Sequence, residues 1–272
     1  LYVKAVSYGP FKPGPDGAPF PPPERARRDF ELMRAMGANT FRTFTPPPTW
    51  LLDLAAEHGL RAIVGVPWAQ QVCFLDDPTI VKDSRKRIGE AARTIGNHPA
   101  VLAIFVGNET PPDIVRWHGP EAVQKFLHSL YDAAKEQAPE TLVSYANYPP
   151  TEYLDLDFLD FLSFNVYLHR EPDFRRYLMR LQNLAEDRPL FLSEFGMDSI
   201  REGAEHQAET LGWQVRAAFE LGVAGVSVFA WTDDWFALSW QTGGGFQVED
   251  WAFGLVDLER RPKPSYHAVQ KT

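Results

Sequence analysis

The sequence predicts a single-domain (β/α)8 TIM barrel over residues 1–272, an α/β fold, and three observations lead to this class. Eight short apolar, β-branched or aromatic runs recur along the chain, and longer segments with helical periodicity lie between them. Dividing 272 residues among eight units gives about 34 residues per unit, which suits a barrel of roughly 250 residues. No linker or shift in composition divides the chain, so we expect one domain.

The expected elements follow one another in strict alternation. The predicted strands cover 3–8, 40–44, 61–66, 101–107, 142–146, 161–166, 190–195 and 225–231. The predicted helices cover 24–36, 50–58, 80–95, 119–137, 174–186 and 204–221, and a closing helix starts near residue 264. Gly37, Gly59 and Gly96 follow three of these helices and suit left-handed C-terminal caps. Proline-rich stretches at 10–23 and 46–48 follow the first two strands and are typical of stiff loops.

Composition and charge exclude several classes of protein. The chain has 27 Lys and Arg against 36 Asp and Glu, a net charge of −9, which would repel a phosphate backbone, so no nucleic-acid partner is expected. No apolar run approaches the roughly 18 to 20 residues that cross a bilayer, so we expect no membrane-spanning segment. One cysteine and the absence of zinc-like Cys/His spacing predict neither a disulfide framework nor a metal. A strand begins directly after Leu1, which suggests an excised domain or mature fragment, with other domains possible upstream.

Two glutamates end apolar strands. Glu109 follows the predicted strand at 101–107, and Glu194 lies at the end of the strand at 190–195. The carboxyl ends of the strands form the active face of such a barrel, so these side chains can converge. Two carboxyl groups about 5 to 5.5 Å apart perform retaining glycoside hydrolysis, whereas a gap of about 6.5 to 9.5 Å predicts inversion.

The residues around both glutamates resemble those of a known group. Gly107-Asn108-Glu109 is similar to the acid/base motif, and Ser193-Glu194-Phe195-Gly196 to the nucleophile motif, of the retaining β-glycosidases of clan A. The resemblance is closest to the catalytic domains of glycoside hydrolase family 2. It extends over nearly the whole chain, including the segments 254–257 and 261–267 near its end.

This resemblance implies roles for individual residues. It makes Glu109 the acid/base and Glu194 the nucleophile, and it implies no cofactor. The residues that it places around the substrate are Arg42 beside the nucleophile, Asn108 at the sugar 2-hydroxyl, Asn165 and Tyr167 at the end of the sixth strand, where Tyr167 orients the nucleophile, and Trp231 under the sugar.

Tryptophans near other strand ends are further candidates for sugar stacking. Trp68 follows the third strand, and Trp235 lies in the long loop after the eighth. This loop also contains Trp240 and Trp251, and its glycines at 243–245 suggest a sugar-binding flap. The alternative is that these aromatic side chains are ordinary core or close the rim of the barrel.

The sequence therefore predicts a retaining β-glycoside hydrolase acting on β-linked gluco- or galacto-configured saccharides. A retaining transglycosylase acting on β-glucans shares the same covalent intermediate and is the first alternative. A carbohydrate-binding barrel without catalysis is the second. The expected partner in each case is an oligosaccharide or β-glycoside.

Overall fold

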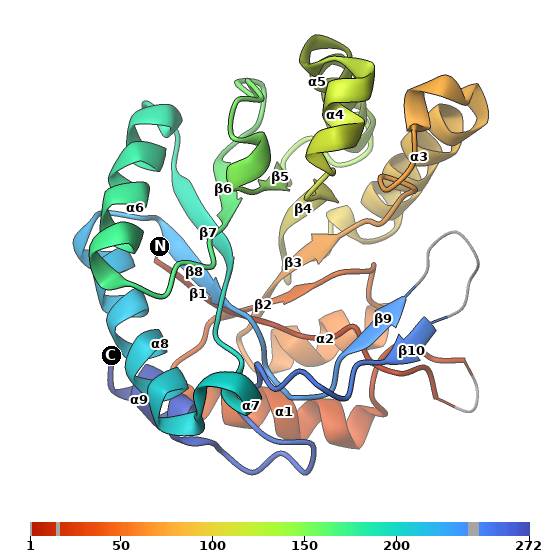
Figure 1. Cartoon of the computed structure of the whole chain (residues 1–272). Helices are drawn as coiled ribbons and strands as arrows, with labels where there is room; N and C mark the ends of the chain where they lie inside the picture. Colours follow the sequence, from red (N-terminus) through yellow and green to blue (C-terminus); the bar gives the residue numbers. More distant parts are fainter. Residues whose placement is uncertain (1, 15–16, 239–244) are drawn as a thin grey trace.

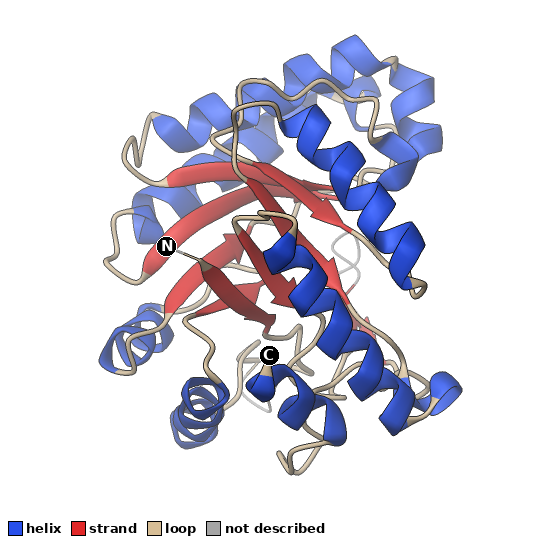
Figure 2. Ribbon diagram, turned by 90° about the vertical axis from the view of Figure 1, so that its left-hand side faces the viewer, coloured by secondary structure: helices blue, strands red, loops and turns tan. Residues whose placement is uncertain are grey.

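The structure is a computed structural model that describes residues 2–14, 17–238 and 245–272. Eight parallel strands close into a barrel in chain order from β1 to β8, and β8 pairs with β1 to complete the ring. Helices surround the strands (Figures 1 and 2). The predicted (β/α)8 barrel is confirmed.

The strands and helices alternate as expected. The barrel strands are β1 (Val3–Ser7), β2 (Thr40–Thr43), β3 (Arg61–Gly65), β4 (Val101–Asn108), β5 (Leu142–Asn147), β6 (Leu162–Asn165), β7 (Leu190–Phe195) and β8 (Gly225–Val228). The helices are α1 (Pro23–Met36), α2 (Thr49–Glu57), α3 (Pro78–Ala91), α4 (Pro112–His118), α5 (Pro120–Lys135), α6 (Glu171–Ala185), α7 (Ser199–Glu202), α8 (Ala204–Glu220) and α9 (Pro264–Lys271).

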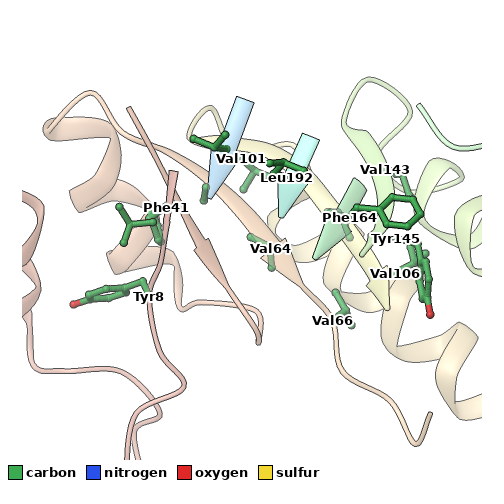
Figure 3. Packing of buried hydrophobic residues seen from close by; sticks show 14 of the residues in the cluster. Tyr8, Phe41, Val64, Val66, Val101, Val106, Val143, Tyr145, Phe164 and Leu192 are labelled. Atoms are coloured by element: carbon green, nitrogen blue, oxygen red, sulfur yellow. The ribbon is translucent and has the colours of Figure 1, made fainter. Parts of the chain in front are cut away.

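Two apolar clusters hold the barrel together. A small cluster fills its interior with side chains that include Ala5, Ile63, Phe105 and Phe191. A much larger cluster lies between the strands and the surrounding helices, and Figure 3 shows part of it from close by. Because side chains alternate between the two faces of a strand, neighbouring residues of one strand enter different clusters.

The helices form where the sequence supplies both an apolar stripe and suitable ends. Helix α5 buries Val123, Phe126, Leu127 and Leu130, which recur at the spacing of one helix face. Gly37 follows the last residue of α1 and has a φ of 99°. This conformation lets the amides of Gly37 and of the residue after it donate to carbonyls of the last helical turn. These local signals explain why most of the predicted boundaries lie within a few residues of the observed ones.

Three features differ from the expectations. Strand β8 ends at Val228, three residues before the predicted end. Gly96 does not form a left-handed cap, because it closes a π-helical turn (Ala92–Gly96) packed closely against Ala138. Helices α4 and α7 and the antiparallel hairpin β9 (Phe236–Leu238) and β10 (Gly245–Gln247), drawn in Figure 1 on the side away from both termini, were not predicted.

No helix in the part of the chain that the structure describes is both long and apolar enough to span a membrane.

Candidate active site

The two strands that carry the glutamates each contain one extra residue near their carboxyl ends. Between Phe105 and Asn108, β4 advances three residues while β5 advances two. Strand β7 advances two residues to reach Glu194 while β6 advances one. A bulge of this kind redirects side chains at the end of a strand. As a result, adjacent residues at the end of β4 both contact the site, and so do adjacent residues at the end of β7.

Glu194 is held as a charged group at the end of β7. One carboxylate oxygen, Oε1, accepts a hydrogen bond of 2.5 Å from Arg42 Nη1, and the two side chains are only 9% and 1% exposed. The other oxygen, Oε2, accepts a bond of 2.9 Å from the Tyr167 hydroxyl. Because an arginine is always protonated, a fixed positive charge lies directly against the Glu194 carboxylate.

Arg42 is fixed on several sides. Its guanidinium group lies 4.5 Å from the ring centre of Phe44 and 5.2 Å from that of Phe105. It also donates to the Ser193 carbonyl at 2.9 Å and to Asn108 Oδ1 at 2.7 Å. Such a cation, packed between rings and hydrogen-bonded at both terminal nitrogens, has little freedom to leave Glu194.

Glu109 lies in a different environment. Its backbone adopts a φ of 51°, and its amide donates to the Ala146 carbonyl on β5. Its Oε1 accepts a hydrogen bond of 2.7 Å from Asn165 Nδ2. Burial, and then the negative charge of Glu194, raise the pKa of Glu109 to about 7, although Asn165 and Arg42 act in the opposite direction. Glu109 is therefore a carboxyl group that can carry a proton near neutrality.

Asn165 connects the two sides of the site. It donates to Glu109 at 2.7 Å and to Asn108 Oδ1 at 3.3 Å, and its own oxygen accepts from Ser193 Oγ at 2.7 Å. Two residues later, Tyr167 bonds to Glu194. The end of one strand thus holds both carboxyl groups, which lie near enough for the charge of Glu194 to affect Glu109.

Glycines beside the glutamates are required by close packing. A β-carbon at Gly107 would lie 3.0 Å from the ring of Tyr145 and 3.3 Å from Trp68 Nε1. A β-carbon at Gly196 would collide with the carbonyl oxygen of Phe229. Both glycines therefore let the backbone that carries a glutamate pack tightly against its neighbours.

Sequence reasoning missed two residues that position the end of β4. The side-chain amide of Gln70 accepts from the Asn108 amide at 3.1 Å and donates to the Asn108 carbonyl, as a neighbouring strand would. The Tyr145 hydroxyl accepts from the Thr110 amide at 2.7 Å. Gln70 lies in a loop, and nothing in its sequence context signals this role.

Aromatic rings line one side of Glu194, and we call this group the aromatic wall. It consists of Phe44, Tyr167, Phe229, Trp235, Trp251 and Phe253. Phe229 is at its centre, with ring centres of Trp235 at 4.7 Å, Phe253 at 5.4 Å and Tyr167 at 6.1 Å. Of the predicted stacking residues, Trp235 therefore lies beside the site.

The other two tryptophans require a correction. Trp231 is completely buried and packs toward Tyr266 of α9 in the outer core. Trp68 is 4% exposed, donates to the Val106 carbonyl at 2.7 Å and packs against Phe74 and Phe126. Neither ring can stack on a sugar in this structure. Phe229, two residues earlier, belongs to the aromatic wall but is itself only 5% exposed.

Part of the predicted flap lies outside the described residues. This part includes Trp240, Gly243 and Gly244, whereas Trp251 belongs to the aromatic wall and Gly245 begins β10. Among the residues that the structure describes, no group of three His, Cys, Asp or Glu side chains could hold a metal ion.

The fold and the carboxyl pair together define a (β/α)8 barrel of the glycosidase class. The chain belongs to glycosyl hydrolases family 2, because the model of that family's TIM barrel domain matches residues 21–219.

Known relatives carry one recurring name. The chain is 28% identical over 188 residues to a β-glucuronidase of Pongo abelii, a match that covers 64% of this chain and 28% of the relative. It is 25% identical over 199 residues to a β-glucuronidase of Streptococcus agalactiae, covering 63% of this chain and 33% of the relative. The match thus spans about a third or less of the length of these relatives.

Solved structures share the fold over the whole chain. A Bifidobacterium dentium β-glucuronidase in complex with coumarin-3-O-glucuronide has a TM-score of 0.83 at 19% identity, covering 100% of this chain and 46% of that one. An Eisenbergiella tayi β-galacturonidase bound to galacturonate has a TM-score of 0.81 at 23% identity, with 100% and 50% covered. At these identities the likeness establishes the fold.

Proposed function

We propose that residues 1–272 form one catalytic domain that hydrolyses β-linked gluco- or galacto-configured saccharides with retention. Glu194 is the nucleophile and Glu109 is the acid and then the base. The observation that carries this proposal is the contrast between the two carboxyl groups, one paired with Arg42 and the other with a pKa raised to about 7. Retaining hydrolysis needs this pair of protonation states at the same pH.

The first step forms a covalent intermediate. A Glu194 oxygen attacks the anomeric carbon, the bond to the leaving oxygen breaks, and Glu109 gives its proton to that oxygen. The sugar is then joined to Glu194 through an ester bond, and the negative charge of Glu194 is lost. Since that charge helps to raise the pKa of Glu109, its loss favours the ionised form of Glu109.

The second step restores the enzyme. Ionised Glu109 takes a proton from water, whose oxygen attacks the anomeric carbon while the bond to Glu194 breaks. Two inversions give a product with the starting configuration. Asn108 Oδ1 is engaged by Arg42, so the amide nitrogen of Asn108 can donate to the sugar 2-hydroxyl. The aromatic wall, and Trp235 in particular, offers apolar rings to the pyranose.

Product analysis tests this proposal. With 4-nitrophenyl β-D-glucoside and β-D-galactoside, proton NMR should show the β-anomer first. Glu109→Gln and Glu194→Gln should each lower kcat/KM by orders of magnitude, and azide should rescue a Glu194→Gly variant as the α-glycosyl azide. An α-anomer as first product, or rescue with unchanged configuration, would contradict the mechanism.

Product analysis with β-glucans and binding measurements separate the two alternative functions. Products longer than the substrate at high β-glucan concentration would indicate a transglycosylase, which uses the same intermediate. Binding of saccharides without turnover, unchanged in both glutamine variants, would indicate a carbohydrate-binding barrel.

A further inference from the structure

The charges around the two glutamates point to a substrate whose sugar ring is uncharged, and we infer that this site selects neutral β-glycosides over β-uronides. The inference rests on the proposed function and narrows its substrate class. It also separates this chain from the relatives and solved structures whose names contain a uronide.

Among the described residues, the cation that contacts Glu194 is Arg42, and both of its terminal nitrogens are already bonded. Arg42 bonds to Glu194 at 2.5 Å through one nitrogen and to Asn108 at 2.7 Å through the other. It is 1% exposed and packed between aromatic rings. Arg42 balances the charge of Glu194, so a uronate carboxylate would add a negative charge to a site that has no positive charge to spare.

The aromatic wall itself carries no positive charge to pair with a uronate. Its rings contact one another at centre separations between 4.7 and 6.4 Å. The two cations beside it are paired with acids: Lys263 Nζ lies 3.0 Å from Asp233, and Arg201 bonds to Asp198 and to Asp250. A carboxylate placed against such a wall loses water without gaining a countercharge, whereas the C–H groups of a neutral pyranose fit aromatic faces.

One further cation lies on a loop near the wall. Lys12 is exposed in the segment that follows β1, and the carbonyl of Pro10 in the same segment accepts from the amide of Phe236 in β9. The segments outside the described residues, 15–16 and 239–244, contain no Lys or Arg. Lys12 is therefore the residue with which to check the inference.

A paired substrate comparison tests the inference on the protein as it is. We expect kcat/KM for 4-nitrophenyl β-D-glucoside or β-D-galactoside to exceed that for the matching glucuronide or galacturonide by about 100-fold, the loss that an unpaired buried charge produces. A uronide cleaved as well as its neutral counterpart would overturn the inference. If Lys12→Ala then removed that activity, Lys12 would be identified as the partner of the carboxylate.

A variant of the wall provides the converse test. Phe253 contacts Tyr167 and Phe229 and is partly exposed, so Phe253→Lys places a cation beside the site, and Phe253→Met is its uncharged control. We expect the lysine variant to shift the ratio of kcat/KM toward the uronide by about tenfold or more, and the methionine variant to leave the ratio unchanged. Equal ratios in the two variants, with both folded by circular dichroism, would count against the inference.

Failure of the proposed function would look different. If no glycoside is cleaved, the proposed hydrolysis is wrong, but calorimetry with methyl β-D-glucoside and methyl β-D-glucuronide still compares the affinities of the two ligands. Tighter binding of the glucoside would support the preference for a neutral ring. Equal or tighter binding of the glucuronide would contradict it.

Discussion

Arg42 Nη1 lies 2.5 Å from Glu194 Oε1, and both side chains are almost completely buried at the mouth of the barrel. The charges come from strands β2 and β7, which are separated by about 150 residues in sequence. Burying two charges is costly, so each depends on the other for compensation. The ion pair therefore links the carboxyl ends of two strands that are not neighbours in the barrel, β2 and β7, at the candidate nucleophile.

Replacing Arg42 by methionine should harm both stability and activity. The variant leaves the Glu194 carboxylate buried without its countercharge, which costs about 3 to 5 kcal/mol of unfolding free energy. Urea denaturation measures this loss, and kcat/KM of the folded protein should fall by orders of magnitude.

A second buried pair supplies the control for Arg42. Arg260 Nε lies 2.9 Å from Asp29 Oδ1, with side chains that are 3% and 0% exposed, and neither residue contacts the candidate site. Arg260→Met should destabilise the protein to a similar extent while its folded fraction keeps its activity. Equal loss of specific activity in both variants would argue against a catalytic role for Arg42.

Tyr167→Phe should slow catalysis and have a smaller effect on stability. It removes the hydrogen bond of 2.9 Å to Glu194 Oε2. Because a hydrogen bond to a charged group contributes about 1.5 to 3 kcal/mol, kcat/KM should fall by roughly 10- to 100-fold. Tyr177→Phe removes a similar bond, of 3.0 Å to Glu152, on the outside of the barrel, and should leave kcat/KM unchanged.

The activity should fall on the alkaline side near the pKa of Glu109. With this pKa raised to about 7, the proton that the leaving group needs is lost as the pH rises through that value. Steady-state kcat/KM for an alkyl glycoside, measured from pH 5 to 9, should therefore decrease above about pH 7. A 2,4-dinitrophenyl glycoside, which departs without a proton, should show a weaker decrease, and identical profiles for both substrates would be inconsistent with Glu109 as the acid.

The same residue should make stability depend on pH. The folded-state pKa of Glu109 lies above its ordinary value of 4.5, so the protonated form stabilises the fold below pH 4.5, and this contribution is lost as pH rises through about 7. Glu109→Gln cannot lose a proton. Its unfolding free energy relative to wild type should thus increase by roughly 2 to 3 kcal/mol between pH 4.5 and pH 8. A difference that stays constant over this range would contradict the raised pKa.

The two tryptophans near the end of β8 should respond differently to truncation. Trp235→Ala removes a ring of the aromatic wall and should raise KM for a saccharide with a smaller loss of stability. Trp231→Ala opens a cavity in the outer core and should cost about 3 to 5 kcal/mol. Substrate kinetics and urea denaturation on both variants give this comparison, and a rise in KM with Trp231→Ala alone would restore the sequence-based assignment.

The fold could be predicted from sequence because its signals are local. Apolar strands such as 101–107, the helical stripe from Val123 to Leu130, and Gly37 after α1 each depend on neighbouring residues only. The two glutamates were identified from their positions at the ends of apolar strands together with the resemblance of the motifs around them.

Other parts of the site depend on distant contacts that the sequence does not encode locally. Gln70 completes the hydrogen bonds of Asn108 from a loop 38 residues away. Trp231 is buried by packing with Tyr266, which lies 35 residues later in the chain, and β8 ends before it at Val228. A contact of this kind is not visible in the residues next to Trp231.

The extra residues in β4 and β7 make the spacing of the chain part of the chemistry. Deleting one residue between Phe105 and Asn108 would restore the ordinary pairing with β5, and the glutamate would then arrive one position earlier, on the opposite face of the strand. Loops beyond the strand ends can change length without this penalty. Among natural variants, we therefore expect insertions and deletions to accumulate in those loops and to be excluded from the last residues of these two strands.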